Sequence, residues 1–168
     1  WLGRTLIQLK QAPAAIGVLD RAIADWPQSE FVPELKFTRI EAIYEDEKRK
    51  PETVTLYAQF ADQFAADDLA ADARFRAALT ALQLNNLKDA KQQSDAFLSN
   101  VAFAKHSSLP DVLFVAAECR IVGDAVDFAK ADELYRRLIG EYPDHVYAEK
   151  SLVRVGFCLS AVGQHAPG

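Results

Sequence analysis

The segment 128–163 decides the fold, and it reads FAKADELYRRLIGEYPDH followed by VYAEKSLVRVGFCLSAVG. In each half, apolar side chains recur at the spacing of one helix face: Ala131, Tyr135 and Leu138, then Leu152, Val155 and Leu159. Each half therefore predicts an amphipathic helix with one apolar stripe. Because a single stripe needs an opposing surface, we expect two antiparallel helices that share it across the turn at Tyr142-Pro143-Asp144.

The residue that opens the second of these helices recurs along the chain at spacings of 38, 39 and 38, as Pro33, Ala71, Pro110 and Ala148. Four positions later each copy has an apolar residue: Phe37, Phe75, Phe114 and Leu152. Near-constant spacing of this kind indicates a helical repeat array.

The residues of the segment resemble the tetratricopeptide repeat. Leu152-x-x-Val155-Gly156-x-x-Leu159 stands where that family has W-x-x-L-G-x-x-Y, and Ala131-x-x-x-Tyr135 with Pro143 stands where it has A-x-x-x-F and P. The resemblance implies an all-α fold, a right-handed superhelical solenoid of antiparallel helix hairpins with about four and a half repeats. The Trp-Pro and Tyr-Pro turns resemble bacterial cell-envelope members, of the Tol-Pal accessory protein and outer-membrane assembly lipoprotein type.

We expect residues 1–168 to form a single array. The predicted helices are 1–11, 13–26, 30–48, 51–65, 68–86, 87–101, 109–123, 126–141 and 146–163, paired as hairpins 1–26, 30–65, 68–101 and 109–141 with 146–163 as a half repeat. We also expect an excerpt of a larger protein, because the chain lacks Met and opens on Trp1-Leu2-Gly3 as if within a helix.

Local chemistry gives further expectations. Ser29 and Ser108 are predicted to cap the helices that follow them. The turn aromatics Trp26, Phe64 and Tyr142 should pack between successive hairpins, and Gly3 and Gly156 should mark close helix contacts.

Composition narrows the function. The 19 basic and 24 acidic residues leave a net charge of -5, and no basic run is interleaved with aromatics, so we expect no nucleic-acid partner. No stretch is long and apolar enough for a membrane span. We expect His106, His145 and His165 to be exposed turn or terminal residues, and Cys119 and Cys158 to be buried thiols. Without nucleotide-binding or catalytic motifs, we expect no enzyme, cofactor or metal.

By resemblance, the first helix of each unit lines a concave face that binds a peptide or a partner helix. Counted from Phe37, Phe75, Phe114 and Leu152, the residues one, five and eight positions later should point to this groove. They are Thr38, Ala42 and Glu45; Arg76, Thr80 and Gln83; Val115, Cys119 and Val122; Val153, Phe157 and Ser160. Arg4 continues the line. The Lys and Asn pattern of chaperone-binding members is missing here, so we do not expect a chaperone-tail adaptor.

The predicted partner-binding residues are Arg39, Arg76, Thr80, Val115, Val153 and Phe157. We expect the groove to be basic around the two arginines and apolar toward the C-terminus, which suits a segment with apolar anchors and some negative charge. Alternatively, a further repeat of a longer protein covers the apolar end.

We therefore expect a non-catalytic protein-protein interaction scaffold that binds a protein or peptide. By resemblance we expect a role in cell-envelope assembly, with the periplasm or cell envelope as the compartment. The alternative is a structural spacer or oligomerisation segment of a larger multidomain protein, and self-association stays open.

Overall fold

A computed structural model describes residues 1–123 and 125–163, and over these residues the chain is helical with no strand. Its α-helices are α1 (Leu2–Gln8), α2 (Ala12–Asp25), α3 (Val32–Tyr44), α4 (Lys50–Gln63), α5 (Leu69–Gln83), α6 (Leu87–Ser99), α7 (Leu109–Glu118), α8 (Phe128–Glu141) and α9 (Ala148–Ala161). A short 3-10 helix, η1 (Val101–Phe103), follows α6. The prediction of an all-α, tetratricopeptide-like solenoid is confirmed. His165 lies outside the described residues.

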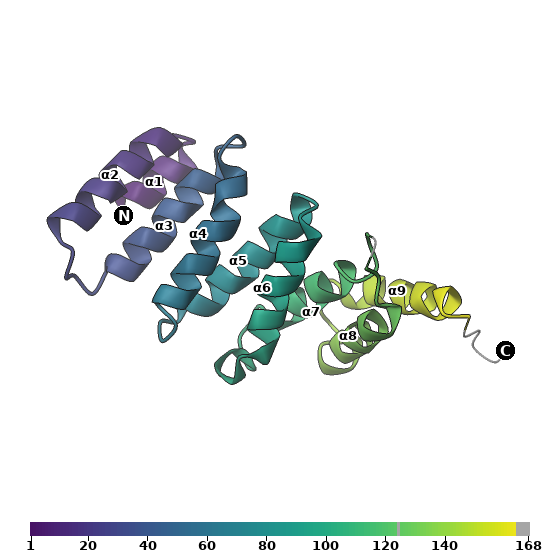
Figure 1. Ribbon diagram of the computed structural model, residues 1–168. Helices are drawn as coiled ribbons and strands as arrows, with labels where there is room; N and C mark the ends of the chain where they lie inside the picture. The colour runs from purple at the N-terminus through teal and green to yellow at the C-terminus, as the bar shows by residue number, and fades with distance from the viewer. Residues whose placement is uncertain (124, 164–168) are drawn as a thin grey trace.

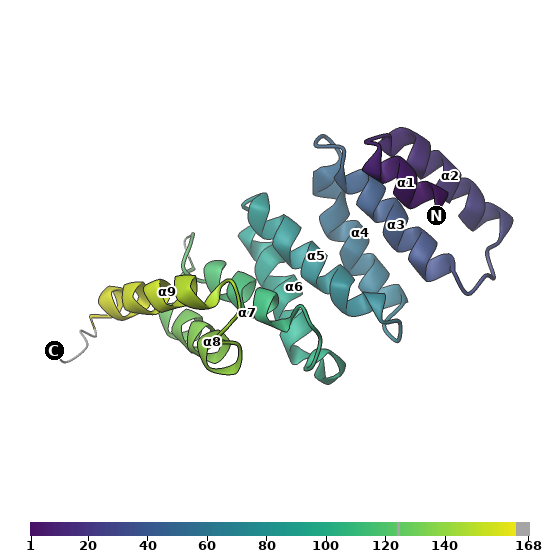
Figure 2. The same cartoon turned by 180° about the vertical axis from the view of Figure 1, so that it is seen from behind.

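The helices stack in chain order, each packing on the next. Contacts also join α1 to α3, α3 to α5 and α5 to α7. The first six helices form two layers, with α2, α4 and α6 toward the viewer in Figure 1 and α1, α3 and α5 toward the viewer in Figure 2. We call the side of the array formed by α1, α3, α5, α7 and α9 the odd-numbered face.

Proline marks the start of several helices, as the sequence predicts. Pro13, Pro33, Pro51 and Pro110 each occupy the first or second position of their helix, where a missing N–H costs no helical hydrogen bond. These positions fix where each helix begins, and so which residues of the repeat face the neighbouring helices.

A side chain at each turn into α3, α5, α7 and α9 accepts a hydrogen bond from the backbone N–H two residues later. The acceptors are Ser29, Asp67, His106 and His145, with distances of 3.2, 2.8, 3.2 and 3.3 Å. They are spaced by 38, 39 and 39 residues, so the bond repeats with the period of the fold. Different residue types thus fix the same turn in every repeat.

The two histidines are not exposed turn residues, and that prediction is wrong. The side chains of His106 and His145 are only 23% and 22% exposed. The Nε2 atom of His106 lies 3.9 Å from Asp72, and that of His145 lies 3.7 Å from Asp111. The expected caps at Ser29 and Ser108 are also wrong, because neither α3 nor α7 begins with a side-chain cap hydrogen bond and the N-cap residue of α3 is Phe31.

The predicted apolar stripe forms the core. Phe37 contacts Tyr57 across α3 and α4 with ring centroids 5.5 Å apart, and Phe114 contacts Tyr135 across α7 and α8 at 6.0 Å. Both tyrosine side chains are fully buried. The equivalent residue of α9, Leu152, is instead 59% exposed, because none of the described helices covers that side of α9.

Of the remaining aromatic and glycine predictions, some are confirmed and others are wrong. Gly3 is a close contact, since a Cβ there would lie 2.8 Å from Leu19 Cδ2, whereas a Cβ at Gly156 would meet nothing within 4 Å. Phe64 packs against a buried cluster that joins α3, α4 and α5, and Tyr142 packs against the C-terminal part of the core, but Trp26 is 62% exposed at its turn. The predictions for Gly156 and Trp26 are therefore wrong, because neither residue is at a close contact.

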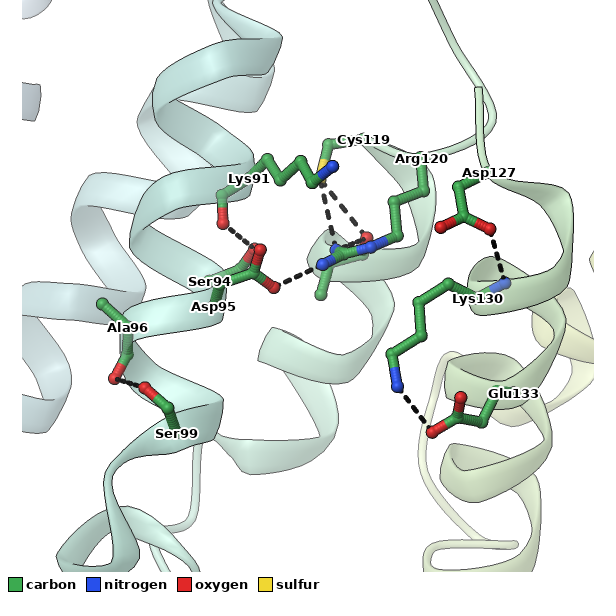
Figure 3. Close-up of polar contacts among 11 residues, drawn as sticks. Lys91, Ser94, Asp95, Ala96, Ser99, Cys119, Arg120, Asp127, Lys130 and Glu133 are labelled. Carbon is green, nitrogen blue, oxygen red and sulfur yellow. Dashed lines mark hydrogen bonds and ion pairs between the residues drawn. The ribbon is translucent and has the colours of Figure 1, made fainter. Parts of the chain in front are cut away.

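Helix α7 ends at Glu118 rather than at residue 123. The buried Arg120 donates through Nη1 to the carbonyl oxygen of Ala116 at 2.6 Å and pairs with Asp95 of α6 (Figure 3). This arginine satisfies a carbonyl that the end of the helix leaves without an intrahelical partner. Val122, predicted to line the groove from α7, therefore lies in the loop beyond the helix.

The loop between α7 and α8 is fixed at both ends. The N–H of Asp127 donates to the carbonyl oxygen of Arg120 at 2.8 Å, and the Asp127 side chain caps α8 by accepting from Lys130 N–H at 2.9 Å (Figure 3). Gly123 has a φ of +83°, which residues with a side chain rarely adopt. These features stop α7 from continuing.

Candidate functional site

The odd-numbered face is hollowed near the N-terminus. A pocket of about 310 Å³ lies where α1, α3 and α5 meet, with one residue from α4. Its lining residues are Arg4, Ile7, Gln8, Glu41, Tyr44, Glu45, Tyr57 and Arg76. We call this hollow the Tyr57 pocket. Of the predicted partner-binding residues it contains Arg76 alone.

Charges in the Tyr57 pocket are balanced. Arg76 Nη2 lies 3.6 Å from Glu41 Oε1, and Arg4 Nη2 lies 3.2 Å from Glu34 Oε1 on the same helix, α3. Burial raises the pKa of Glu41, and the guanidinium groups of Arg76 and Arg4 partly oppose this rise. The expected basic groove is therefore wrong at this position, because the arginine on each helix faces a carboxylate on its neighbour.

Arg39 does not join this face. It pairs with Asp20 of α2 and lines a separate hollow of about 270 Å³ between α2, α3 and α4. The prediction that Arg39 lies in the groove is therefore wrong. Arg39 lies two positions beyond Phe37, which turns its side chain around α3 toward the even-numbered helices.

Thr80 and Val115 cannot contact a partner in this structure. Each side chain is 2% exposed. The direct packing of α5 on α7 accounts for this, because residues beside the stripe become part of the contact between those two helices. The prediction that these two residues bind a partner is therefore wrong, and both belong to the core.

The C-terminal end of the odd-numbered face is apolar and open. Val153 and Phe157 of α9 are 72% and 48% exposed. One side of the Phe157 ring packs against Phe128 of α8, with centroids 5.7 Å apart. Leu152 adds to the exposed apolar surface of the same helix. Phe157 is thus held in place by a neighbour while still offering a face to a partner.

The structure contains a hydrogen-bonded cluster at the end of α7 that the sequence did not predict. Glu118 accepts from Tyr135 of α8 at 2.7 Å and from both Nε and Nη2 of Arg154 of α9, at 2.7 and 2.9 Å. The acid lies one position before a residue predicted to line the groove, but periodicity alone does not show that three helices converge there. The cluster positions α9 and with it Phe157.

The cysteines are buried, as predicted. Burial raises the pKa of both the Cys119 and the Cys158 thiol, so both are protonated at neutral pH. Over the described residues, no group of three or more His, Cys, Asp or Glu side chains is arranged to hold a metal ion. None of the helices described is long and apolar enough to cross a membrane.

The comparison with known protein families finds a match for one repeat of the chain. Residues 111–145 match the model of the tetratricopeptide repeat family, and this segment covers most of α7 and all of α8. No curated protein matches the chain significantly. Tetratricopeptide repeats generally mediate protein-protein interaction. The match and the all-helical array together support a tetratricopeptide-type protein.

Proposed function

We propose that the chain is a non-catalytic scaffold that binds a segment of a partner protein along the odd-numbered face. The observation that supports this most is that two dissimilar accessible features lie on odd-numbered helices. The Tyr57 pocket lies between α1, α3 and α5, and the exposed Phe157 lies on α9. An extended or helical segment with a polar group at one end and an apolar side chain at the other fits these features.

Each feature has properties of an interface position. Phe157 combines a half-exposed ring with a fixed orientation, so little side-chain freedom remains to be lost on binding. Arg76 has a side chain that is 44% exposed and ion-paired but makes no hydrogen bond to another described residue. Its five N–H donors are available to a partner.

A bacterial cell-envelope role is a narrower form of this proposal. Its support is the pair of aromatic-proline turns at Trp26-Pro27 and Tyr142-Pro143. The partner would then be another protein of envelope assembly, and the compartment the periplasm or the cell envelope.

The experiment uses a partner captured by the whole chain, identified and purified. We expect Phe157→Ser and Arg76→Glu each to weaken its binding by roughly tenfold or more. Trp26→Ser and Arg21→Glu are matched controls on α2 and its turn, where both side chains are well exposed, and they should leave the affinity unchanged. If instead the α2 controls release the partner and the odd-numbered variants do not, the binding surface is the opposite one.

Self-association is the second candidate function, and α9 favours it. Val146, Leu152 and Val153 are 79%, 59% and 72% exposed near one end of the array. Apolar surface concentrated in this way is typical of contact sites. Sedimentation over a range of concentrations distinguishes the two: an oligomerising segment should form dimers that Leu152→Asp disrupts, whereas a monomeric scaffold should sediment identically with and without that change.

A further inference from the structure

The Tyr57 pocket contains a hydroxyl group without a hydrogen-bond partner. The Tyr57 side chain is fully buried, and no polar atom of the described residues pairs with its hydroxyl oxygen. Buried polar groups are nearly always satisfied, so an orphan hydroxyl calls for an explanation. Burial raises the pKa of Tyr57, and the charges of Arg76, Glu41 and Glu45 also act on it. Tyr57 lines the pocket together with these three residues.

The two charged neighbours have unused hydrogen-bonding capacity as well. Arg76 and Glu41 approach to 3.6 Å, which is an ion pair but too long for a hydrogen bond, and neither makes a side-chain hydrogen bond within the described part of the chain. The Tyr57 hydroxyl is buried, so a ligand reaches it only when a lining side chain moves, and Arg76, whose side chain is 44% exposed, has room to move. The pocket thus offers donors from Tyr57 and Arg76 and an acceptor from Glu41.

Charge decides which ligand fits this set. A carboxylate would be attracted by Arg76 and repelled by Glu41 at similar distances, and an ammonium group would meet the reverse. A neutral group that both accepts and donates hydrogen bonds satisfies the donors and the acceptor together. A primary amide has this pairing on one edge, because its carbonyl oxygen and one of its N–H groups lie on the same side of the C–N bond.

We propose that the Tyr57 pocket binds an amide group of the partner segment, whose carbonyl oxygen accepts from the Tyr57 hydroxyl and Arg76 while its N–H donates to Glu41. The inference rests on the proposed function, because it assigns the chemistry of one position in the bound segment. The amide is that of an Asn or Gln side chain, because the carbonyl oxygen and the N–H of a trans main-chain peptide point in opposite directions and cannot meet a donor and an acceptor 3.6 Å apart. The pocket volume of about 310 Å³ accommodates such a side chain.

The test is an NMR titration of the isotope-labelled chain with small probes at matched ionic strength. Propionamide represents the side-chain amide and N-methylacetamide the main-chain amide, while propionate and propylammonium carry the two charges. We expect saturable shifts at the Arg76 Nε–Hε and Tyr57 ring signals with propionamide. At equal concentration these should exceed those with either ion by about threefold or more. Binding of N-methylacetamide as strong as that of propionamide would contradict the side-chain source.

Tyr57→Phe is the matched variant, because it removes the hydroxyl and keeps the buried ring. It should weaken amide binding by about fivefold or more, while Tyr142→Phe, which removes a hydroxyl outside the pocket, should not change it. Equal shifts with ions and amides, unchanged binding by Tyr57→Phe, or no saturable shift at all would each overturn the amide assignment. In those cases Phe157→Ser still tests the scaffold separately, because that residue lies outside the pocket.

Discussion

Arg154 forms a two-pronged ion pair with Glu118, donating from Nε and Nη2 to the two carboxylate oxygens at 2.7 and 2.9 Å. The pair joins α9 to the end of α7, and Tyr135 of α8 donates to the same carboxylate at 2.7 Å. The Glu118 side chain is 14% exposed and that of Arg154 is 33% exposed. One acid thus connects three successive helices.

Removing this acid should destabilise the C-terminal repeats. We expect Glu118→Ala to lower the free energy of unfolding by about 2 to 3 kcal/mol, because it leaves a buried tyrosine hydroxyl and a partly buried guanidinium without their acceptor. Glu141→Ala removes a partner from the exposed pair with Arg137 and should cost about 0.5 kcal/mol or less. Urea unfolding of both variants measures this. Equal losses would show that the Glu118 cluster is no stronger than a surface pair.

The two buried tyrosines should respond differently to loss of their hydroxyl groups. Tyr135→Phe should cost about 1 to 2 kcal/mol, because the change leaves the Glu118 carboxylate short of a donor. Tyr57→Phe removes a hydroxyl that has no partner among the described residues, so its unfolding free energy should stay the same or rise. Thermal or urea unfolding compares the pair. A clear loss in Tyr57→Phe would reveal a hidden partner, such as a buried water molecule.

The repeated turn hydrogen bond can be tested at His106. His106→Ala should destabilise by about 1 kcal/mol, since it removes the acceptor for the Ser108 N–H. His106→Ser places at this turn the residue type that performs the same role at Ser29, so it should recover part of that loss. Both variants lose the contact with the Phe97 ring equally, and the difference between them therefore isolates the hydrogen bond. Identical stabilities would rule out the turn bond as a stabilising feature.

Alkaline pH should weaken the fold. Burial raises the pKa of Tyr57 and Tyr135 above their ordinary 10.0, with the bond to Glu118 also raising that of Tyr135. Because the unfolded chain releases these protons first, the folded state holds more protons above pH 10.0. The free energy of unfolding then falls as pH rises, by up to about 1.4 kcal/mol per pH unit per group.

Urea unfolding from about pH 8 to about pH 11 measures the alkaline loss. The double variant Tyr57→Phe with Tyr135→Phe should lose less stability above pH 10.0 than the parent. The same slope in both proteins would mean that other groups cause the loss. The buried thiols of Cys119 and Cys158, whose pKa values burial raises above 9.0, contribute a decline that begins earlier and is common to both.

The architecture was predictable because it depends on spacing. Pro33, Ala71, Pro110 and Ala148 stand within the first turns of α3, α5, α7 and α9, so their period of 38 or 39 residues located the repeats. The stripe residues Phe37 and Phe114 are buried for the same reason. Helix ends were less predictable, because the end of α7 depends on Arg120 reaching Asp95 on another helix.

The candidate site was only partly predictable because it depends on how helices pack against one another. Periodicity places Arg39, Thr80 and Val115 near the groove side of their helices, yet it does not show that α5 packs on α7 or that Asp20 lies beside Arg39. Phe157 is exposed on α9, while Arg76 is exposed but neutralised by Glu41. The acidic partners of Arg39 and Arg76 lie on other helices, and the periodicity of one helix gives no information about the side chains of its neighbours.

Hydrogen-deuterium exchange of the whole chain, with and without a purified partner, tests binding to the odd-numbered face most directly. We predict that the partner slows amide exchange in α1, α3, α5 and α9, with the largest change around the Tyr57 pocket and Phe157. The exchange of α2 and α6, which contribute no residue to the Tyr57 pocket, should stay as it is in the free chain. Slowed exchange confined to α2, α4, α6 and α8 would contradict the account.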